Sequence, residues 1–230
     1  MRALPDPAAL GAALDRDGYA IVPGVLPADL CAALAAGYDD DAAFRSRVVM
    51  ARHGFGQGEY RYYAYPLPEP VATLRAVFYP LLQPIAERWA ATLGEATRYP
   101  PTLDAWLRHC HRAGQCRPTP LLLKYGPDDY NCLHQDLYGE HVFPLQLAIL
   151  LSAPSRDFTG GEFVLTEQRP RRQSRAEVVP LTQGDGVVFP VNHRPVAGTR
   201  GPYRTTMRHG VSRVRSGARF TLSVIFHDAA

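Results

Sequence analysis

The chain has 230 residues, of which 46% are apolar and 20% are charged, a composition typical of a globular protein. These values exclude a disordered chain, a collagen-like repeat and a coiled coil. The net charge is only +3, but residues 1–166 carry 14 basic and 18 acidic side chains whereas residues 167–230 carry 11 and 4, so the C-terminal third could attract an anionic ligand.

The sequence contains no signal that directs it to a membrane. The longest apolar stretch, near Leu145–Leu151, is far too short to cross a bilayer. The segment Met1–Leu10 lacks the basic-then-apolar layout of a secretion signal, and four scattered cysteines suit a reducing compartment. We therefore expect a cytoplasmic protein without a membrane partner.

The N-terminal half is predicted to be mainly helical. Pro7–Asp17 and Pro27–Gly37 have helical character and flank a short β-prone run at Tyr19–Val22. Apolar residues recur with a helical period along Val71–Leu93, although two internal prolines should kink or divide this helix. Thr102–Ala113 is a further predicted helix.

The sequence becomes β-prone from residue 119 onwards. Short apolar runs alternate with Gly, Pro and Asp turn signals, which is typical of a sandwich or a barrel. We therefore predict a single α+β domain over residues 1–230, with mainly helical support in 1–118 and a β core in 119–230. The loops Gln168–Ala176 and Asn192–Arg208 are long enough to act as flaps. The predicted strands are Leu121–Tyr125, Val142–Ser152, Glu162–Thr166, Glu177–Leu181, Gly186–Val191, His209–Val214 and Arg219–His227.

His134 and Asp136 form the sharpest local signal for chemistry. Residues i and i+2 of an extended segment point to the same side, so this imidazole and this carboxylate can bind one metal ion together. A third ligand has to come from another strand. His209 and His193 are the candidates, and His227 is a weaker one.

The residues that follow His209 favour it as the third ligand. His209–Val214 and Arg219–Phe226 are predicted to form a hairpin, which would bring Arg219 close to the metal. An arginine there can bind a carboxylate through two parallel hydrogen bonds. Two histidines and one carboxylate around a metal are typical of non-haem Fe(II) oxygenases. By contrast, the residue ten positions after His193 is a tyrosine.

These residues resemble the motif of the 2-oxoglutarate- and Fe(II)-dependent dioxygenase superfamily, in which His-x-Asp precedes a distant His and then an Arg about ten residues later. The flanking segments are similar as well, from about residue 14 to the C-terminus, although residues 39–118 carry little that is diagnostic. The resemblance indicates a bacterial-type branch with some AlkB-like features. The similar segments are LDRDGYAIVPGVLP (14–27), LLLKYGPDDYNCLHQD (121–136), FTGGEFVL (158–165) and GDGVVF (184–189).

The resemblance implies a double-stranded β-helix, which is a distorted jelly-roll barrel, with an N-terminal helical layer. It also implies that Fe(II) is the cofactor, that 2-oxoglutarate and O2 are co-substrates, and that succinate and CO2 are released. An acidic ligand at residue 136, rather than Ala or Gly, favours hydroxylation over halogenation. The implied site residues are His134, Asp136 and His209 for the metal, and Arg219, Tyr125 and Thr221 for 2-oxoglutarate.

Three functions are compatible with this pattern. The first is hydroxylation of a small molecule or an amino-acid side chain. The second is AlkB-like oxidative dealkylation of a nucleic acid, which the basic C-terminal third and the spacing from Tyr125 to His134 favour. This branch ranks second because it has an Asn where this chain has Leu123 and a second Arg where this chain has Ile225. The third is a metal- or ligand-binding barrel without catalysis.

Two further groups of residues have a functional and a structural interpretation. His109, Cys110, His111 and Cys116 are residue types that zinc favours, but their spacing lacks a second paired half. A polar helix end with two incidental cysteines explains them better. The arginines within residues 169–175 and 194–208 either bind an anionic substrate or form a solvated surface.

Overall fold

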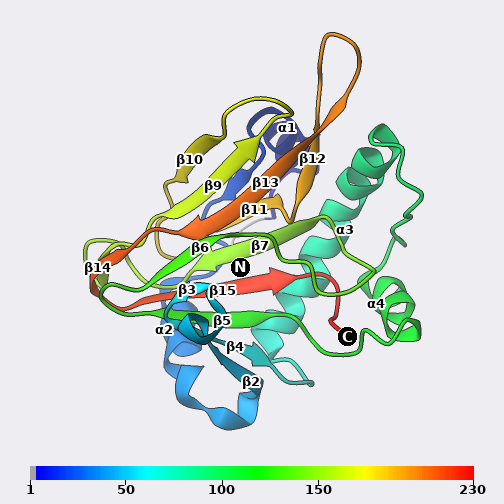
Figure 1. Ribbon diagram of the computed structural model, residues 1–230. Coiled ribbons are helices and arrows are strands. Elements are labelled where there is room, and N and C mark those ends of the chain that lie inside the picture. Colours follow the sequence, from blue (N-terminus) through cyan, green and yellow to red (C-terminus); the bar gives the residue numbers. More distant parts are fainter. Residues whose placement is uncertain (1–3) are drawn as a thin grey trace.

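The computed structural model describes residues 4–230 as two antiparallel sheets that face each other, with helices on the outer side of the larger sheet (Figure 1). This is the predicted α+β jelly-roll architecture. The helices are α1 (Pro7–Asp17), α2 (Ala28–Ala36), α3 (Glu69–Thr92) and α4 (Leu103–Arg112).

The larger sheet has the spatial order β1 (Ala20–Val22), β11 (Gly186–Pro190), β7 (Leu145–Leu150), β15 (Arg219–Ile225), β5 (Leu121–Tyr125), β4 (Glu59–Tyr63) and β2 (Phe44–Val49). The smaller sheet has the order β10 (Arg175–Val179), β9 (Phe163–Gln168), β13 (Tyr203–Val211), β6 (Tyr130–His134) and β3 (Gly56–Gln57), with β12 (His193–Val196) paired to β13; β14 (Val214–Gly217) pairs separately with β8 (Phe158–Gly160).

Strand alternation gives the larger sheet one face toward the helices and one toward the space between the sheets. Strand β15 shows this division clearly. Leu222 and Val224 belong to the helix-facing hydrophobic core. Arg219, Thr221 and Ser223 alternate with them and line the cavity between the sheets. Successive side chains of a strand point to opposite faces, so one short sequence serves both the core and the site.

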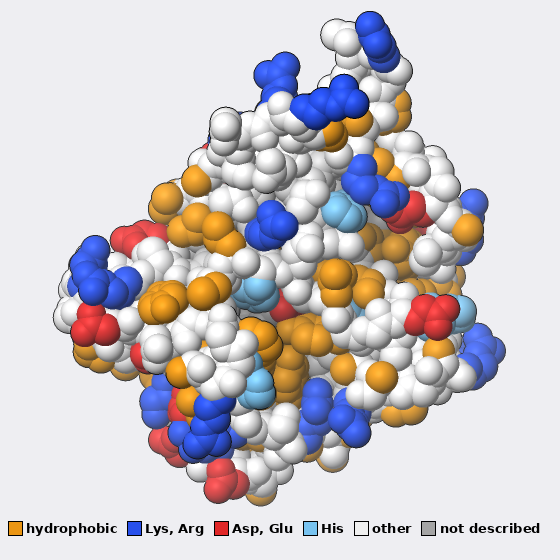
Figure 2. Space-filling view, viewed as in Figure 1, with side chains coloured by type: hydrophobic (Ala, Val, Ile, Leu, Met, Phe, Trp, Pro, Cys, Tyr) orange, Lys and Arg blue, Asp and Glu red, His pale blue; other side chains and the backbone are white. Residues whose placement is uncertain are grey.

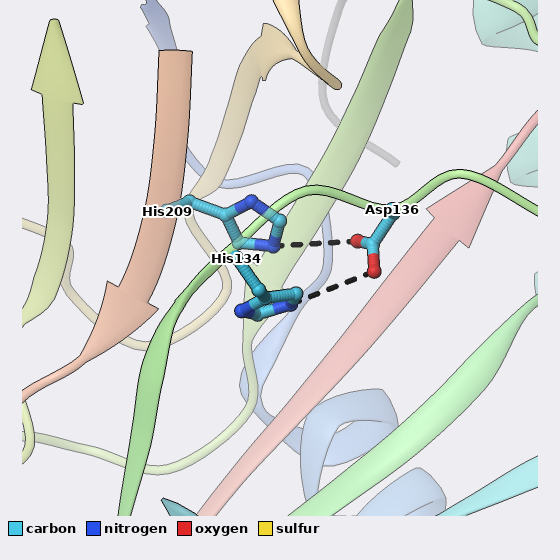
Figure 3. Close-up of side chains that lie close together, drawn as sticks. All are labelled: His134, Asp136 and His209. Atoms are coloured by element: carbon cyan, nitrogen blue, oxygen red, sulfur yellow. Dashed lines mark ion pairs between the residues drawn. The ribbon is translucent and has the colours of Figure 1, made fainter. Parts of the chain in front are cut away.

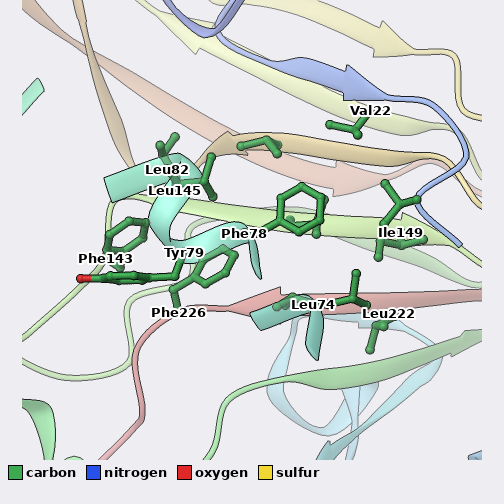
Figure 4. Close-up of a cluster of buried hydrophobic side chains, with 14 of the residues drawn as sticks. Val22, Leu74, Phe78, Tyr79, Leu82, Phe143, Leu145, Ile149, Leu222 and Phe226 are labelled. Atoms are coloured by element: carbon green, nitrogen blue, oxygen red, sulfur yellow. The ribbon is translucent and has the colours of Figure 1, made fainter. Parts of the chain in front are cut away.

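The main core lies between α3 and the larger sheet (Figure 4). Leu74, Phe78 and Leu82 recur at helical spacing and form one buried cluster with Ile149 of β7 and Leu222 of β15. Full burial of each such side chain contributes about 1.5–3 kcal/mol. This packing holds the sheet that carries Arg219 rigid from behind.

Pro80 and Pro84 were predicted to kink or divide helix α3; the helix continues through both prolines and is not divided. Both prolines are exposed and lie four residues apart, so they share the solvent face of the helix. Carbonyl groups that lose an N–H donor on this face can be hydrated instead. Burial of the apolar side chains on the opposite face stabilises the helix by more than the missing backbone hydrogen bonds cost.

Neither α3 nor any other helix within residues 4–230 has the length and apolar character needed to cross a membrane.

Two predicted connections are wrong. Strands β13 and β15 form no hairpin, because β13 pairs with β6, β9 and β12 whereas β15 pairs with β5 and β7. The predicted flap Asn192–Arg208 is largely the hairpin of β12 and β13. Alternation of apolar residues identifies a strand but not its partner, and β12 has too little apolar alternation to be identified at all. His209 and Arg219 therefore lie in opposite sheets.

The N-terminal 118 residues supply strands as well as helices. Strands β1, β2 and β4 extend the larger sheet at its two edges, and β3 extends the smaller sheet. The N-terminal part is thus an integral section of the barrel in addition to the predicted helical support.

His227, which follows β15, makes the stability of the fold dependent on pH. Its Nδ1 accepts a hydrogen bond from the backbone N–H of Phe143, and burial lowers its pKa from 6.5 to about 3. The unfolded chain takes up a proton below about pH 6.5 that the folded chain excludes, so stability present above that pH is lost as the pH falls toward 3. At about pH 4 we expect a loss of about 3 kcal/mol relative to neutral pH.

The variant His227→Asn tests this, because its amide oxygen can accept the same N–H without titrating. Thermal unfolding at constant ionic strength should show a smaller fall in Tm between neutral and acidic pH for the variant than for the wild type. Parallel pH profiles would contradict the assignment.

Candidate metal centre and co-substrate pocket

A cavity of about 300 Å³ lies between the two sheets. Strands β4, β5, β7, β11 and β15 line it from the larger sheet, and β6, β9 and β13 line it from the smaller sheet. Most of its surface is apolar, and its polar groups gather around a His-Asp-His cluster and around one arginine. An apolar cavity with a few convergent polar groups is typical of a ligand site.

His134, Asp136 and His209 converge in this cavity (Figure 3). One nitrogen or oxygen atom from each lies within 4.8 Å of those of the other two. His134 Nε2 is 3.5 Å from Asp136 Oδ1, and His209 Nε2 is 3.3 Å from Asp136 Oδ2. Among residues 4–230 this is the only group of three or more His, Cys, Asp or Glu side chains that could hold a metal ion in this way.

The register of β6 and β13 brings the two histidines together. His134 is the residue opposite His209, and Val211 lies opposite Asn131, so β6 has one residue more than β13 over this interval. This bulge leaves Cys132 exposed, while Asn131 lines the cavity. Asp136 follows the end of β6, where the chain is no longer bound to strand geometry.

The histidines present the nitrogen that a metal requires. His134 Nδ1 lies 2.8 Å from the carbonyl oxygen of Cys132, to which an Nδ1–H would donate. The lone pair of Nε2 then faces Asp136. Burial lowers the pKa of His209, which favours its neutral, metal-binding form. Two imidazoles and one carboxylate on one side of a cavity are the ligand set of non-haem Fe(II) sites, so the residues fit the metal.

The carboxylate of Asp136 is held from two sides. Tyr138 Oη donates to Oδ1 at 2.6 Å, and Gln146 Nε2 donates to Oδ2 at 2.9 Å. Burial by itself would raise the pKa of Asp136, but hydrogen bonds and charge from His134 and His209 lower it well below its usual value. Asp136 is therefore ionised and oriented, as a metal ligand has to be.

We expect Tyr138→Phe to weaken Fe(II) binding about 10-fold, because loss of a hydrogen bond to a ligand typically costs 10- to 100-fold in metal affinity. Anaerobic titration with Fe(II), or with Co(II) followed by its absorption, measures this directly. Tyr63→Phe is the matched control, since Tyr63 is buried in the helix-facing core. Equal metal affinity for the Tyr138 variant and the control would contradict a role in orienting Asp136.

Arg219 lies on the larger sheet, and only 1% of it is exposed. Its Nη1 donates to Thr221 Oγ1 at 2.6 Å, and its guanidinium carbon lies 5.6 Å from the ring centre of Tyr125. Its buried Nε has no hydrogen-bond partner among residues 4–230. Burial lowers its pKa to about 10, so it remains charged at neutral pH. A buried cation without an acid to pair with is costly, and a carboxylate ligand would relieve that cost.

The structure therefore groups the predicted residues as two clusters on one cavity. Asn131, Tyr138 and Gln146 contact these clusters but were not identified from the sequence. Gln146 was detectable, because it is a polar residue inside an otherwise apolar strand. Tyr138 shares the two-residue spacing of His134 and Asp136. Asn131, which donates to Tyr125 Oη at 3.3 Å, was not detectable because the bulge places it.

The alternative third ligands lie elsewhere. His193 begins β12 and borders a separate small cavity together with Trp89 and Glu95. His227 is engaged with the backbone of Phe143. Neither side chain belongs to the converging group formed by the described residues.

The side chains of the His/Cys-rich segment also diverge. His109 stacks on Trp106 with ring centres 5.5 Å apart. Cys110 is buried, whereas His111 Nε2 lies 2.8 Å from a carboxylate oxygen of Asp228. The contact of His111 with Asp228 attaches the end of α4 to the C-terminal residues of the chain.

The sequence of this chain is similar to a protein family and to a mycobacterial protein. Residues 58–229 match the family model Oxygenase-NA, described as an oxygenase catalysing oxidative methylation of damaged DNA. Uncharacterized protein Rv2227 of Mycobacterium tuberculosis is 54% identical over 165 residues, which cover 72% of this chain and 71% of that protein.

Solved structures share the fold. A prolyl-4-hydroxylase from Pseudomonas putida is 17% identical with a TM-score of 0.57, and the match covers 95% of this chain and 96% of that one. An oxidoreductase of the 2OG-Fe(II) oxygenase family from Burkholderia pseudomallei is 17% identical with a TM-score of 0.56, covering 98% and 94%. At this identity the likeness shows a common architecture.

Proposed function

The chain belongs to the Oxygenase-NA family. We propose that it is a 2-oxoglutarate- and Fe(II)-dependent oxygenase that oxidises an alkyl group on a nucleic-acid base. The observation that carries the oxygenase chemistry is the convergence of His134, Asp136 and His209 beside a buried, charged arginine in one cavity. The family description supports DNA as the substrate, and the basic C-terminal third favours a polyanion. Together they outweigh the two sequence departures that placed dealkylation second.

In this proposal His134, Asp136 and His209 hold Fe(II). Bound iron with 2-oxoglutarate and O2 supplies the oxidising chemistry, in which the keto acid becomes succinate and CO2. Arg219 binds the far carboxylate of 2-oxoglutarate, and Thr221 orients the guanidinium through the hydrogen bond to Nη1. The apolar wall excludes water from the reacting groups.

The proposed reaction balances without a further reductant. One oxygen atom of O2 enters succinate and the other enters the substrate, so that an N-methyl group becomes N-hydroxymethyl. This group then breaks its C–N bond, and formaldehyde leaves while the base regains a hydrogen. Each turnover consumes one 2-oxoglutarate and one O2, and releases one succinate, one CO2 and one formaldehyde.

The test is to incubate purified protein with Fe(II), 2-oxoglutarate and a single-stranded oligonucleotide that carries one N-methylated base. We expect formaldehyde and succinate in equal amounts, whereas the unmodified oligonucleotide should yield only slow, uncoupled succinate. Hydroxylation of a free amino acid or small molecule, without formaldehyde from the oligonucleotide, would instead support the first function considered from the sequence. Absence of 2-oxoglutarate binding would support a barrel without catalysis.

A further inference from the structure

Large apolar side chains are exposed around the mouth of the cavity. Phe55 and Leu137 line the cavity and are still 47% and 49% exposed. Tyr130 and Leu133 of the adjoining β6 are 38% and 48% exposed. Figure 2 shows hydrophobic and histidine side chains together near the centre of this face. Exposed apolar groups gathered in this way mark a binding surface.

The backbone holds Phe55 in place while its ring remains accessible. Its N–H donates to the carbonyl oxygen of Met50 at 3.2 Å, and its carbonyl oxygen accepts from the N–H of Cys132 at 2.9 Å. The next residue, Gly56, has φ +131°, and a Cβ there would lie 2.3 Å from the carbonyl oxygen of Tyr130. Only glycine permits this close approach, so the sequence holds the backbone beside Phe55 against β6.

His53 provides a second ring beside Phe55. The ring centres are 5.3 Å apart and the ring planes differ by 23°, which is a stacked arrangement. His53 itself is exposed. Phe55, which backbone hydrogen bonds anchor at the mouth of the cavity, and the His53 ring stacked on it form a preorganised aromatic surface.

Unpaired positive charge lies close to this surface. Arg52 directly precedes His53, and Arg208 lies on β13, the strand that pairs with β6; both side chains are exposed. Neither side chain forms an ion pair with any residue between 4 and 230. Figure 2 shows further Lys and Arg side chains on the same face. A partner that fits must combine flat apolar groups with negative charge.

We infer that Phe55 and His53 form a stacking platform for a base of single-stranded nucleic acid, and that Arg52 and Arg208 contact its phosphates. The inference rests on the proposed function and deepens it. Aromatic side chains that stack on bases beside cationic groups are the common means of binding single strands. A base can reach the cavity only after it has left a duplex stack, so a single strand is the expected form.

The test compares variants in binding a fluorescently labelled single-stranded oligodeoxythymidine, by anisotropy between roughly 50 and 200 mM salt. Phe55→Ala should raise Kd about 10-fold at every salt concentration, because loss of one stacking contact acts independently of counterions. Phe55→Trp should bind like the wild type. Arg208→Ala should reduce the slope of log Kd against log salt by about 1. Val178→Ala, which removes another exposed apolar side chain, is the control and should change neither value.

The outcomes separate this inference from the proposed function. Wild-type protein that binds the oligonucleotide and releases formaldehyde, together with unchanged binding by Phe55→Ala at an unchanged Tm, overturns the platform alone. Wild-type protein that neither binds at low salt nor releases formaldehyde overturns both. A prolyl peptide that binds the wild type but not Phe55→Ala, with no binding of the oligonucleotide, assigns the surface to peptides and overturns the inference.

Discussion

Asp136→Ala is expected to abolish Fe(II) retention and all 2-oxoglutarate turnover. The carboxylate is the only acidic group in the converging set of the described residues, and the two histidines alone leave the metal with two protein ligands. Its removal also ends the contacts with Tyr138 and Gln146 that orient this side of the site. Anaerobic Fe(II) titration and succinate formation measure the two effects. Glu140→Ala, which removes an exposed acid four residues further on, should retain both.

The choice of His209 as the third ligand can be tested in the same assays. His209→Ala should lose iron like Asp136→Ala, because its Nε2 faces the same carboxylate. His193→Ala should retain iron, because His193 borders a different cavity. If His193→Ala lost iron while His209→Ala kept it, the ligand assignment would be wrong. The melting temperature of each variant, measured without metal, separates loss of a ligand from loss of the fold.

Arg219→Ala is expected to leave Fe(II) binding intact while raising the Kd for 2-oxoglutarate about 100-fold or more. A buried arginine that pairs with a carboxylate contributes at least about 3 kcal/mol when its partner would otherwise be left uncompensated. Calorimetric titration of the Co(II)-loaded protein with 2-oxoglutarate measures this constant without turnover. Arg219→Lys should recover part of the affinity, because lysine restores the positive charge but cannot form the two parallel hydrogen bonds of a guanidinium.

The control for this prediction is Arg213→Ala; Arg213 is an exposed arginine between β13 and β14 that pairs with Asp128. It should bind 2-oxoglutarate like the wild type. An unchanged constant in Arg219→Ala would mean that the co-substrate is held elsewhere. A loss of Fe(II) binding in that variant would mean that Arg219 supports the metal site structurally.

Local sequence was sufficient for several of the elements and for the residue types of the candidate site. The two-residue spacing of His134 and Asp136 predicted that both side chains could bind one metal ion, and the structure brings them together, although Asp136 lies beyond the end of β6. The alternation Arg219, Thr221 and Ser223 follows from the same strand periodicity. Helix α4 and strand β5 lie within one residue of their predicted bounds.

Other features could not be predicted from the sequence, because they depend on parts of the chain that are distant in sequence. Pro80 and Pro84 were expected to kink or divide α3, which remains one continuous helix because the larger sheet stabilises its opposite face. The hairpin expected between His209 and Arg219 does not exist, since the two residues belong to opposite sheets. Asn131 faces the cavity only because of a bulge that the pairing of β6 with β13 creates.

The sequence by itself determined which side chains are able to bind a metal and a dicarboxylate, because residue chemistry and strand periodicity are properties of neighbouring positions. Only the tertiary structure decided that these side chains meet across one cavity, and that Tyr138 and Gln146 orient the carboxylate of Asp136. It also decided that Phe55 stands at the cavity mouth. Strand partners, bulges and exposed surfaces result from packing between segments far apart in the chain, and no local pattern encodes them.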